Sequence, residues 1–546
     1  MKIRFNWGGI CLYNIVPQPV SILTNSSRKG FTLHAGTTIT DFSFAKDFKE
    51  FVRKHFDKKI HLHEEVGEEK AIVLKIDENM EHEEGYKLLC ADRRVEITAK
   101  TETGLFYGLQ TLRQMLVQKN GKLPYTEIED YPRFDYRGFM LDCGRYFYKV
   151  EEIKKIIDLM AFHKLNVFHW HLTEDQGWRI EIKKYPLLTE KGSVRDHTNF
   201  NHKSHGGYYT QEDIKDIVDY CHQRKIKVIP EIDMPGHMVS AIACYSHLSC
   251  CNRKLDVATH WGVKHDVLCA GKESTYQFAF DVLDEVIDLF PDKIIHIGGD
   301  EVVKMRWKNC PDCQKVIKDN NLKDEDELQL FFMNKINSYL KEKGYSSIMW
   351  NYDNCENAEN LDSDIAWTVC GLSKNGDLVK NELKRGRRLI NTSCYPYYFD
   401  FPYGWNTLKK VCNDDGALTE NDGDTWGIEA QMWTEYVPNL EKLEFLTFPR
   451  LGAMAENAWA EKGYPSFATF IHKINDYYKY LDLYNVNYAT VKKACPSFIY
   501  KHASSLWFKR RVFHWQGLHN LIDDAKAKKE AEHFAKNRID KKQLQS

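Results

Sequence analysis

The sequence lacks the features that identify several large classes of protein. No segment approaches the roughly 20 consecutive apolar residues that a membrane-spanning helix needs, so we expect no membrane span. The formal net charge is only -2 over 546 residues, whereas a nucleic-acid-binding protein usually concentrates positive charge on one face. There is no low-complexity segment, no short repeat and no glycine-rich loop that would bind a phosphate. We therefore expect a partner other than nucleic acid.

A clear secretion signal is missing as well. The run Met1-Lys-Ile-Arg has the charge of a signal-peptide start, but the apolar segment 5–13 after it is short and is interrupted by one asparagine and two glycines. A signal peptide needs an apolar stretch of about 7–15 residues. We expect a cytoplasmic protein, with secretion as the alternative.

The cysteines do not form the pattern of a disulfide framework. There are 15, an odd number, and they are scattered through apparent core segments, which favours reduced thiols. Cys310-Pro-Asp-Cys313 has the spacing of a zinc-binding pair, but no second pair has matching spacing. Cys250-Cys251 and Cys269 lie upstream and could be near in space. We predict no metal and no cofactor, with a zinc site at these cysteines as the alternative.

The chain contains an alternation of strand and helix patterns from about residue 137 onward. Its length suggests two to four domains. Eight strand–helix units predict a (β/α)8 TIM barrel of the α/β class. The expected strands are Arg137–Asp142, Val167–Leu172, Lys227–Asp233, Lys293–Gly298, Ser347–Trp350, Ile365–Val369, Arg388–Ser393 and Gly427–Trp433. The expected helices are Val150–His163, Gln211–Arg224, Thr275–Phe290, Glu325–Lys343, Leu378–Arg385 and one near Glu441–Trp459.

The two ends of the chain differ from this barrel pattern. Short strands at Ala71–Ile76, Gly85–Leu89 and Val95–Ala99, followed by an amphipathic helix at Thr103–Val117, predict a small α+β domain with an antiparallel sheet. The polar, lysine-rich end predicts surface helices. We therefore divide the chain into an N-terminal α+β domain (1–131), a catalytic barrel (132–490) and a C-terminal helical extension (491–546).

Adjacent carboxylates end the fourth barrel strand, in the run Lys293-Ile-Ile-His-Ile-Gly-Gly-Asp300-Glu301. Neighbouring side chains on a strand point in opposite directions, so Asp300 and Glu301 can have different environments and different pKa values, as acid–base chemistry requires. The structural alternative is a helix N-terminus, where acidic residues are common.

Polar and aromatic residues follow nearly every other strand too. The active site of a TIM barrel lies at the C-terminal ends of its strands, so these residues predict an acid-rich pocket walled by indoles, which suits a neutral, polyhydroxylated ligand such as a sugar. The residues are Asp142, Arg145, His169, His171, Glu174, Asp175, Glu231, Asp233, His237, Trp350, Trp367, Tyr395, Tyr398, Asp400, Glu429, Trp433 and Glu435.

Two other functions compete with catalysis on a sugar. His169-Trp-His171 has the His-x-His spacing of a metal-dependent barrel hydrolase, but strands 5 and 6 supply tryptophan rather than further histidine ligands, so we favour buried structural histidines. No Ser/His/Asp arrangement favours a serine nucleophile. A barrel that binds sugar without catalysis is the second alternative.

Five motifs together resemble the β-N-acetylhexosaminidases of glycoside hydrolase family 20. They are His296-Ile-Gly-Gly-Asp-Glu301, Arg137-Gly-Phe-Met-Leu-Asp142 with Arg145, Leu165-Asn-Val-Phe-His-Trp-His-Leu172, Pro230-Glu-Ile-Asp-Met-Pro-Gly-His237 and Trp433-Thr-Glu435. The resemblance covers about residues 10–485, and Ile15-Val-Pro-Gln-Pro19 resembles the start of the family's small N-terminal domain.

The resemblance implies hydrolysis assisted by the substrate, an exception to the usual two-carboxylate scheme. The 2-acetamido carbonyl would attack the anomeric carbon and form an oxazolinium intermediate. Glu301 would act as general acid and then base, and Asp300 would orient the acetamido group. His237 would contact the acid and be held by a carboxylate, which is the first of an Asp-Asp pair in many members. Here that pair is Glu174-Asp175, so which of the two holds His237 is open.

The remaining roles implied by the resemblance concern substrate binding. The predicted enzyme releases single terminal GlcNAc or GalNAc residues from oligosaccharides or glycoconjugates. Release of a disaccharide stays open, because it depends on loops such as His197–Tyr208. Assembly as a homodimer stays open too. Arg145 would bind the 3- and 4-hydroxyls, Asp400 the 6-hydroxyl and Glu435 the 4- or 6-hydroxyl. Trp350, Trp367 and Trp433 would surround the acetamido methyl, and Tyr398, preferred over Tyr395, would donate to its carbonyl.

Overall fold

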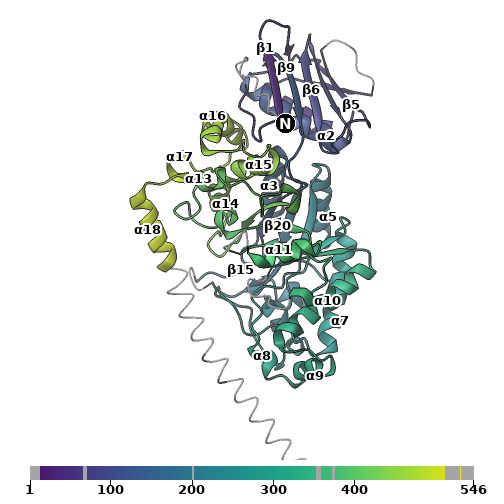
Figure 1. The fold of residues 1–546 in the computed structure, drawn as a ribbon, viewed down its shortest axis with the longest axis vertical. Coiled ribbons are helices and arrows are strands. Elements are labelled where there is room, and N and C mark those ends of the chain that lie inside the picture. Colours follow the sequence, from purple (N-terminus) through teal and green to yellow (C-terminus); the bar gives the residue numbers. More distant parts are fainter. Residues whose placement is uncertain are drawn as a thin grey trace, which may run out of the picture.

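The computed structural model of the chain describes residues 13–64, 70–198, 202–351, 358–371 and 376–510, with the single positions 525 and 529. Figure 1 shows a small sheet domain at one end of an elongated molecule and a larger strand–helix domain beneath it. The first twelve residues, most of the predicted C-terminal extension and three residues of the His197–Tyr208 loop lie outside the described residues.

The small domain contains a seven-stranded sheet in the order β1-β9-β6-β7-β5-β3-β4. Strands β1, β9, β6 and β7 are antiparallel, as predicted, and β5, β3 and β4 extend the sheet in parallel. The predicted helix is α2 (Glu102–Gln118). Its N-cap is Thr101, whose hydroxyl accepts the Gly104 N–H. The other elements are β1 (Ser21–Asn25), β2 (Phe31–Thr32), β3 (Thr38–Thr40), α1 (Ala45–Phe56), β4 (His61–His63), β5 (Ala71–Ile76), β6 (Tyr86–Ala91), β7 (Arg94–Ala99), β8 (Lys122–Leu123) and β9 (Tyr125–Asp130).

The large domain is the predicted (β/α)8 barrel. Eight strands, all parallel to their neighbours, close into a barrel, and each expected strand is present in the expected order. They are β10 (Tyr136–Asp142), β11 (Val167–His171), β16 (Lys227–Glu231), β17 (Ile294–His296), β18 (Ser346–Trp350), β19 (Ala366–Val369), β20 (Leu389–Asn391) and β21 (Gly427–Met432). The main covering helices are α3 (Val150–Phe162), α5 (Gln211–His222), α7 (Glu273–Leu289), α10 (Glu325–Glu342) and α11 (Asp377–Lys384).

The prediction of a single helix near Glu441–Trp459 is wrong in the number of helices. The structure has two helices there, α14 (Leu440–Thr447) and α15 (Arg450–Trp459). Phe448 between them is extended, with φ -105° and ψ 133°. The residue before a proline is sterically disfavoured in the α conformation, so Pro449 ends the first helix although the apolar periodicity continues.

The interior of the barrel changes from apolar to polar along its axis. Tyr136, Val167, Ile229, Ile348, Ala366 and Ile390 form an apolar cluster near the N-terminal ends of the strands. Because side chains on a strand alternate between faces, the next inward layer comes two residues later, and there it contains His169, Glu231, Thr368 and Glu429. The apolar layer therefore closes one end of the barrel beneath a charged one.

Buried ionic contacts join the two domains. Lys164 Nζ lies 2.7 Å from Asp130 Oδ2, with both side chains fully buried, and Trp459 Nε1 donates to the other oxygen of Asp130 at 2.8 Å. Removing one partner of such a pair leaves a buried charge uncompensated, so these contacts fix the small domain on the barrel. After α15 the chain forms α16 (Phe467–Leu483), α17 (Val491–Ala494) and α18 (Phe498–Lys509).

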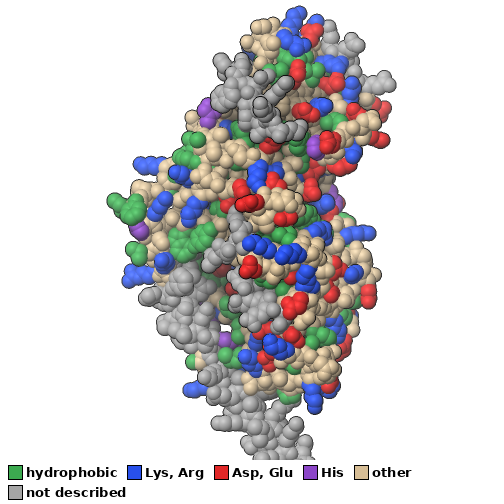
Figure 2. Space-filling view, viewed as in Figure 1, with side chains coloured by type: hydrophobic (Ala, Val, Ile, Leu, Met, Phe, Trp, Pro, Cys, Tyr) green, Lys and Arg blue, Asp and Glu red, His purple; other side chains and the backbone are tan. Residues whose placement is uncertain are grey.

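The surface shows no segregation of charge on the face that Figure 2 displays. Acidic and basic side chains are interspersed over both domains there. Within the described part of the chain, no helix is both long and apolar enough to cross a membrane.

Candidate active site

The carboxylates Asp300 and Glu301 lie on a sharply bent segment after β17. Gly298 and Gly299 have φ of +65° and +100°, which side-chain-bearing residues rarely adopt. A Cβ on Gly298 would lie 1.7 Å from Asp233 Oδ1, and the same oxygen accepts the Gly299 N–H at 3.1 Å. Glu301 itself has φ +51°. Strained backbone of this kind concentrates at functional sites, where the surrounding structure holds it in place.

Asp300 offers a free acceptor. Its side chain is 25% exposed, and among the described residues nothing hydrogen-bonds to its buried Oδ1. Burial raises the pKa of Asp300 to about 6, which the charge of His237 opposes and the charge of Glu301 reinforces. A buried carboxylate oxygen without a partner is costly, and a ligand N–H placed there would relieve that cost.

Glu301 has a different environment from its neighbour. Its side chain is 48% exposed, and its Oε2 lies 3.4 Å from His237 Nε2. Burial raises the pKa of Glu301, but the hydrogen bond and charge of His237 outweigh burial and the net shift is downward. The two carboxyls therefore have pKa values displaced in opposite directions, and His237 holds a proton beside Glu301.

Glu174 is the carboxylate that holds His237. Its Oε2 lies 3.0 Å from His237 Nδ1, whereas Asp175 Oδ2 lies 3.6 Å away and Asp175 Oδ1 accepts the Val239 N–H. Burial lowers the pKa of His237, but Glu174 and Asp233 outweigh it and hold that pKa well above its usual value. The question left open by the Glu174-Asp175 pair is thus answered by geometry.

Arg145 connects the carboxylates on the other side of the site. Its guanidinium contacts Asp142 at 3.1 Å, Glu174 at 2.7 Å and Glu435 at 3.5 Å. Burial, reinforced by Glu435, raises the pKa of Asp400 well above its usual value. Oδ1 of Asp400 is also buried without a hydrogen-bond partner in the described part of the chain. The guanidinium of Arg145 can donate hydrogen bonds to the hydroxyls of a ligand, and the carboxyls of Asp400 and Glu435 can accept hydrogen bonds from them.

Aromatic side chains form a wall beside the carboxylates. The rings of Trp350 and Trp433 lie 5.5 Å apart and those of Tyr398 and Trp433 lie 6.4 Å apart. Trp350 Nε1 donates to Glu231 at 2.7 Å, which fixes the ring. Tyr395, by contrast, is 38% exposed. The structure therefore places Tyr398 at the site and Tyr395 outside it.

Trp367 is not part of this wall, so its predicted role is wrong. In the barrel register Trp367 pairs with Met349 and Thr368 pairs with Trp350. Trp367 packs in the main core together with Met349, and the Arg387 guanidinium lies 4.4 Å from its ring centroid. Cys370, which points to the opposite face of the chain from Trp367, packs against the Trp350–Trp433 cluster instead. The alternation of Trp367-Thr-Val-Cys370 could have indicated that only one of these two residues faces the site.

The histidines of β11 belong to an ionic network beneath the site. His169 lies between Glu231 and Glu429, with one ring nitrogen 3.0 Å from each. Burial lowers its pKa, but Glu429 and Glu231 outweigh burial and raise it to about 9. His171 also contacts Glu231. Both histidines are buried and contact carboxylates, an arrangement that fits the structural interpretation. Glu231 and Asp233 were noted at a strand end in the sequence, but no role was predicted for them. In the structure Glu231 accepts the Trp350 Nε1–H, and Asp233 accepts the Gly299 N–H and so holds the bend after β17.

Comparisons with known proteins find several that are named as β-hexosaminidases or β-N-acetylhexosaminidases. A β-hexosaminidase of Porphyromonas gingivalis is 39% identical over 510 residues, which is 87% of this chain and 64% of that protein. The β-N-acetylhexosaminidase structure from Bacteroides fragilis has a TM-score of 0.77 and 32% identity, covering 89% of this chain and 99% of the other. The exo-β-N-acetylglucosaminidase of Vibrio harveyi, solved with N-acetylglucosamine, has a TM-score of 0.78 and 28% identity over 88% of this chain and 79% of its own.

The family models cover nearly all of the described chain. The model of the glycosyl hydrolase family 20 catalytic domain matches residues 134–462, and the model of domain 2 of that family matches residues 12–131. The resemblance predicted from the five motifs is thereby confirmed: this chain belongs to glycosyl hydrolase family 20.

Proposed function

We propose that this protein is an exo-acting β-N-acetylhexosaminidase that removes terminal, non-reducing β-linked GlcNAc or GalNAc from glycans or glycoconjugates with retention of configuration. The observation that carries the proposal is the unequal pair at the end of β17. Among the described residues, the buried Oδ1 of Asp300 has no hydrogen-bond partner. Glu301 is more exposed and contacts His237. The relatives named β-hexosaminidase support the same activity, although the first of them is longer than this chain.

The acetamido group of the substrate supplies the nucleophile. Its carbonyl oxygen attacks the anomeric carbon while the glycosidic C–O bond breaks, and Glu301 transfers a proton to the departing oxygen. The product of this step is an oxazolinium ring and a free alcohol. Water then attacks the same carbon, Glu301 takes its proton, and the ring opens to restore the acetamide. Two inversions at one carbon give retention.

Asp300 orients the acetamide and stabilises the charge that develops on it. Its Oδ1 can accept the acetamido N–H, which directs the carbonyl oxygen toward the anomeric carbon. As the oxazolinium forms, positive charge grows on that nitrogen, beside an ionised carboxylate already held in position. Charge stabilisation of this preorganised kind is usually the largest single contribution to catalysis.

The proton for the leaving group is shared by His237 and Glu301. In the free site His237 retains it, because Glu174 holds the pKa of His237 high while the pKa of Glu301 is low. A shift of that proton across the 3.4 Å between Nε2 and Oε2 yields a neutral imidazole and a protonated acid without a proton from solvent. Bound sugar favours the shift, because it covers the half-exposed Glu301 and desolvation disfavours its carboxylate.

The polar groups opposite the acid support removal of one terminal sugar. Arg145, Asp400 and Glu435 can together bind the hydroxyls at the far side of the ring, since the guanidinium donates and the two carboxyls accept or donate. Hydroxyls that bind all three groups would be free rather than linked to a further sugar, which favours a terminal residue. Trp350 and Trp433 would pack on the acetamido methyl.

The test compares p-nitrophenyl β-N-acetylglucosaminide with the plain β-glucoside, in the wild type and in Glu301→Gln. We expect turnover of the acetamido substrate alone and its loss in the variant. Equal turnover of the glucoside would contradict the role of the acetamide. Turnover of a longer glycan with release of a disaccharide would replace the exo assignment, and binding without turnover would indicate a barrel that has lost catalysis. Light scattering tests the open alternative of a homodimer.

A further inference from the structure

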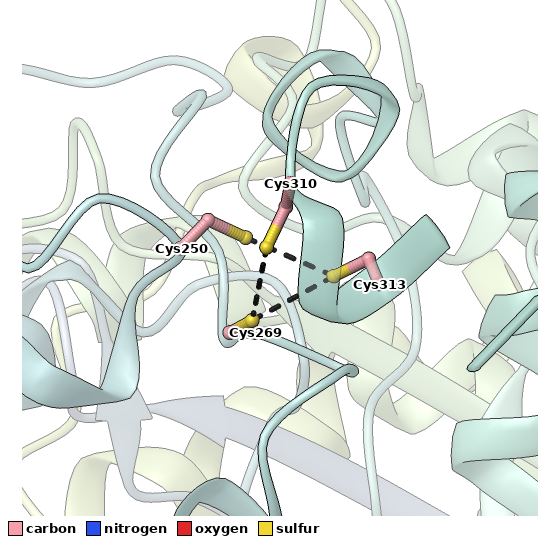
Figure 3. Close-up of side chains that lie close together, drawn as sticks. All are labelled: Cys250, Cys269, Cys310 and Cys313. Atoms are coloured by element: carbon pink, nitrogen blue, oxygen red, sulfur yellow. Dashed lines mark hydrogen bonds between the residues drawn. The ribbon is translucent and has the colours of Figure 1, made fainter. Parts of the chain in front are cut away.

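Four cysteines distant in sequence converge outside the active site. Cys250, Cys269, Cys310 and Cys313 direct their sulfurs toward one another from two loops and the start of a helix (Figure 3). All four side chains are buried, the most accessible at 7%, and none is in a disulfide. The four sulfur atoms all lie within 4.8 Å of one another.

The spacing of the sulfurs fits a single tetrahedral ion. Cys269 Sγ lies 3.6 Å from Cys313 Sγ and 3.7 Å from Cys310 Sγ, and Cys250 Sγ lies 3.9 Å from Cys313 Sγ. Zinc–thiolate bonds of about 2.3 Å in a regular tetrahedron place the sulfurs about 3.8 Å apart. A disulfide would require about 2.05 Å, and a cluster of several irons would hold the sulfurs further apart than one ion does.

The fold builds this arrangement from two pairs. Ser249 and Leu268 form an antiparallel bridge, which brings Cys250 and Cys269, the next residue after each, to one side. Cys310 is the N-cap of α9 (Pro311–Asp319) and Cys313 lies in its first turn. A Cβ on Gly271 would lie 2.2 Å from the Cys313 backbone nitrogen, so only glycine permits the loop to approach the helix this closely.

Without a cation, the four adjacent thiols cannot all satisfy one another by hydrogen bonds. Each can donate only one proton, and Cys269 and Cys313 each have two other sulfurs within hydrogen-bonding distance. A divalent cation removes the conflict because a coordinating thiol is deprotonated outright. Four thiolates with no oxygen or nitrogen donor select zinc among the common divalent ions.

We propose that Cys250, Cys269, Cys310 and Cys313 bind one structural Zn²⁺ ion in a closed site of four thiolates. The prediction of no metal from the sequence is thereby revised, since the second pair has no Cys-x-x-Cys spacing and is formed by the Ser249–Leu268 bridge. With four protein ligands the ion has no open position for water or substrate, so its role is structural.

The ion would connect two loops that border the active site. Cys310 follows Glu301 by nine residues. In the other loop, the Leu268 N–H donates to Pro235 O at 2.9 Å, two residues before His237, and the Ala258 N–H donates to Asp175 O at 3.1 Å. Zinc would therefore hold the segment after β17 against the loop that supports His237 and Asp175.

The test measures metal in the full-length protein after removal of any affinity tag. Mass spectrometry of the metal content should give one zinc per chain. In Cys269→Ser and in Cys313→Ser the zinc content per chain should fall about tenfold or more. Cys251→Ser, adjacent to a ligand, and Cys221→Ser, a fully buried cysteine of α5, are controls that should retain zinc. Chelation of the wild type should lower Tm by about 5 °C or more, and re-addition of zinc should restore it.

A second measurement uses the wild type alone, because a ligand variant can fail to fold. Cobalt added to the chelated protein should give the visible and near-ultraviolet bands of tetrahedral thiolate coordination, which stoichiometric zinc then removes. Protein without zinc and without these bands would overturn the proposal. So would disulfides among the four cysteines in non-reducing peptide mapping, or iron in place of zinc. None of these readouts depends on glycosidase activity.

Discussion

Lowering the pH from 7 to 5 should remove most of the activity by protonating Asp300. In the proposed mechanism Asp300 is ionised when it accepts the acetamido N–H and stabilises the oxazolinium. Its pKa of about 6 is well above the usual value for aspartate, which is about 3.9. A raised pKa means that the ionised form is lost as the pH falls through 6, so the acid limb of kcat/KM reports Asp300.

The magnitude follows from the fraction of Asp300 that is ionised. With a pKa of about 6, roughly nine tenths of the carboxyl is ionised at pH 7 and roughly one tenth at pH 5. We therefore expect kcat/KM to fall about tenfold over this interval, because kcat/KM reports the free enzyme. The shared proton of His237 and Glu301 is retained throughout, since the pKa of His237 is held well above its usual value.

The assay follows p-nitrophenol released from the acetamido substrate in quenched samples at constant ionic strength. Asp175 is the critical control, because burial also raises its pKa to about 6. Asp175→Asn should keep the acid limb, whereas the residual activity of Asp300→Asn should vary little between pH 5 and 7. Intrinsic fluorescence at each pH verifies that the fold is intact. An acid limb that disappears in Asp175→Asn and persists in Asp300→Asn would refute the assignment.

Three further tests use single substitutions in the site and in the core beside it. Asp300→Asn should lower kcat by about 10²–10³-fold at pH 7 with an unchanged Tm; near-full activity would exclude assistance by the substrate. Trp367→Ala should destabilise the fold by about 3–5 kcal/mol and leave KM unchanged, whereas Trp350→Ala should raise KM for the acetamido substrate; the reverse pattern would return Trp367 to the site. Glu174→Gln should lower kcat by about 10–100-fold and move the alkaline limb to lower pH, because His237 loses the charge that raises its pKa; an unmoved limb would mean that Glu174 has only a structural role.

The barrel could be predicted from the sequence because its strands carry strong local patterns. Each strand is a short apolar run covered by helices, and the order of eight such runs admits few topologies. The same regularity located the site, since the residues after each strand meet at one end of a closed barrel. Asp300, Glu301 and His237 were found in this way, and the structure brings them together.

Residue-level details failed where they depend on which face of an element points inward. Trp367 lies on the correct strand at nearly the correct level, but the register of β19 against β18 directs it into the core. The break at Pro449 illustrates the opposite case, in which a local steric rule outweighs apolar periodicity. The cysteine site depends on a bridge between Ser249 and Leu268, and no spacing rule reports contacts between loops.

The ionic network beneath the site explains how so many carboxyls can be buried at one end of a barrel. Isolated buried carboxylates would take up protons instead of remaining charged. Here burial raises the pKa of Glu231, but the charges and hydrogen bonds of the neighbouring histidines outweigh it and hold that carboxyl well below its usual value. Glu174 is held low in the same way by Arg145 and His237. The ionised Glu174 then holds the proton on His237, so the acid function proposed for Glu301 depends on charges that do not touch the substrate. The buried charges around His237 therefore keep a proton on its imidazole, next to Glu301. Glu301, the carboxyl proposed to pass this proton to the substrate, is 48% exposed and His237 only 5%.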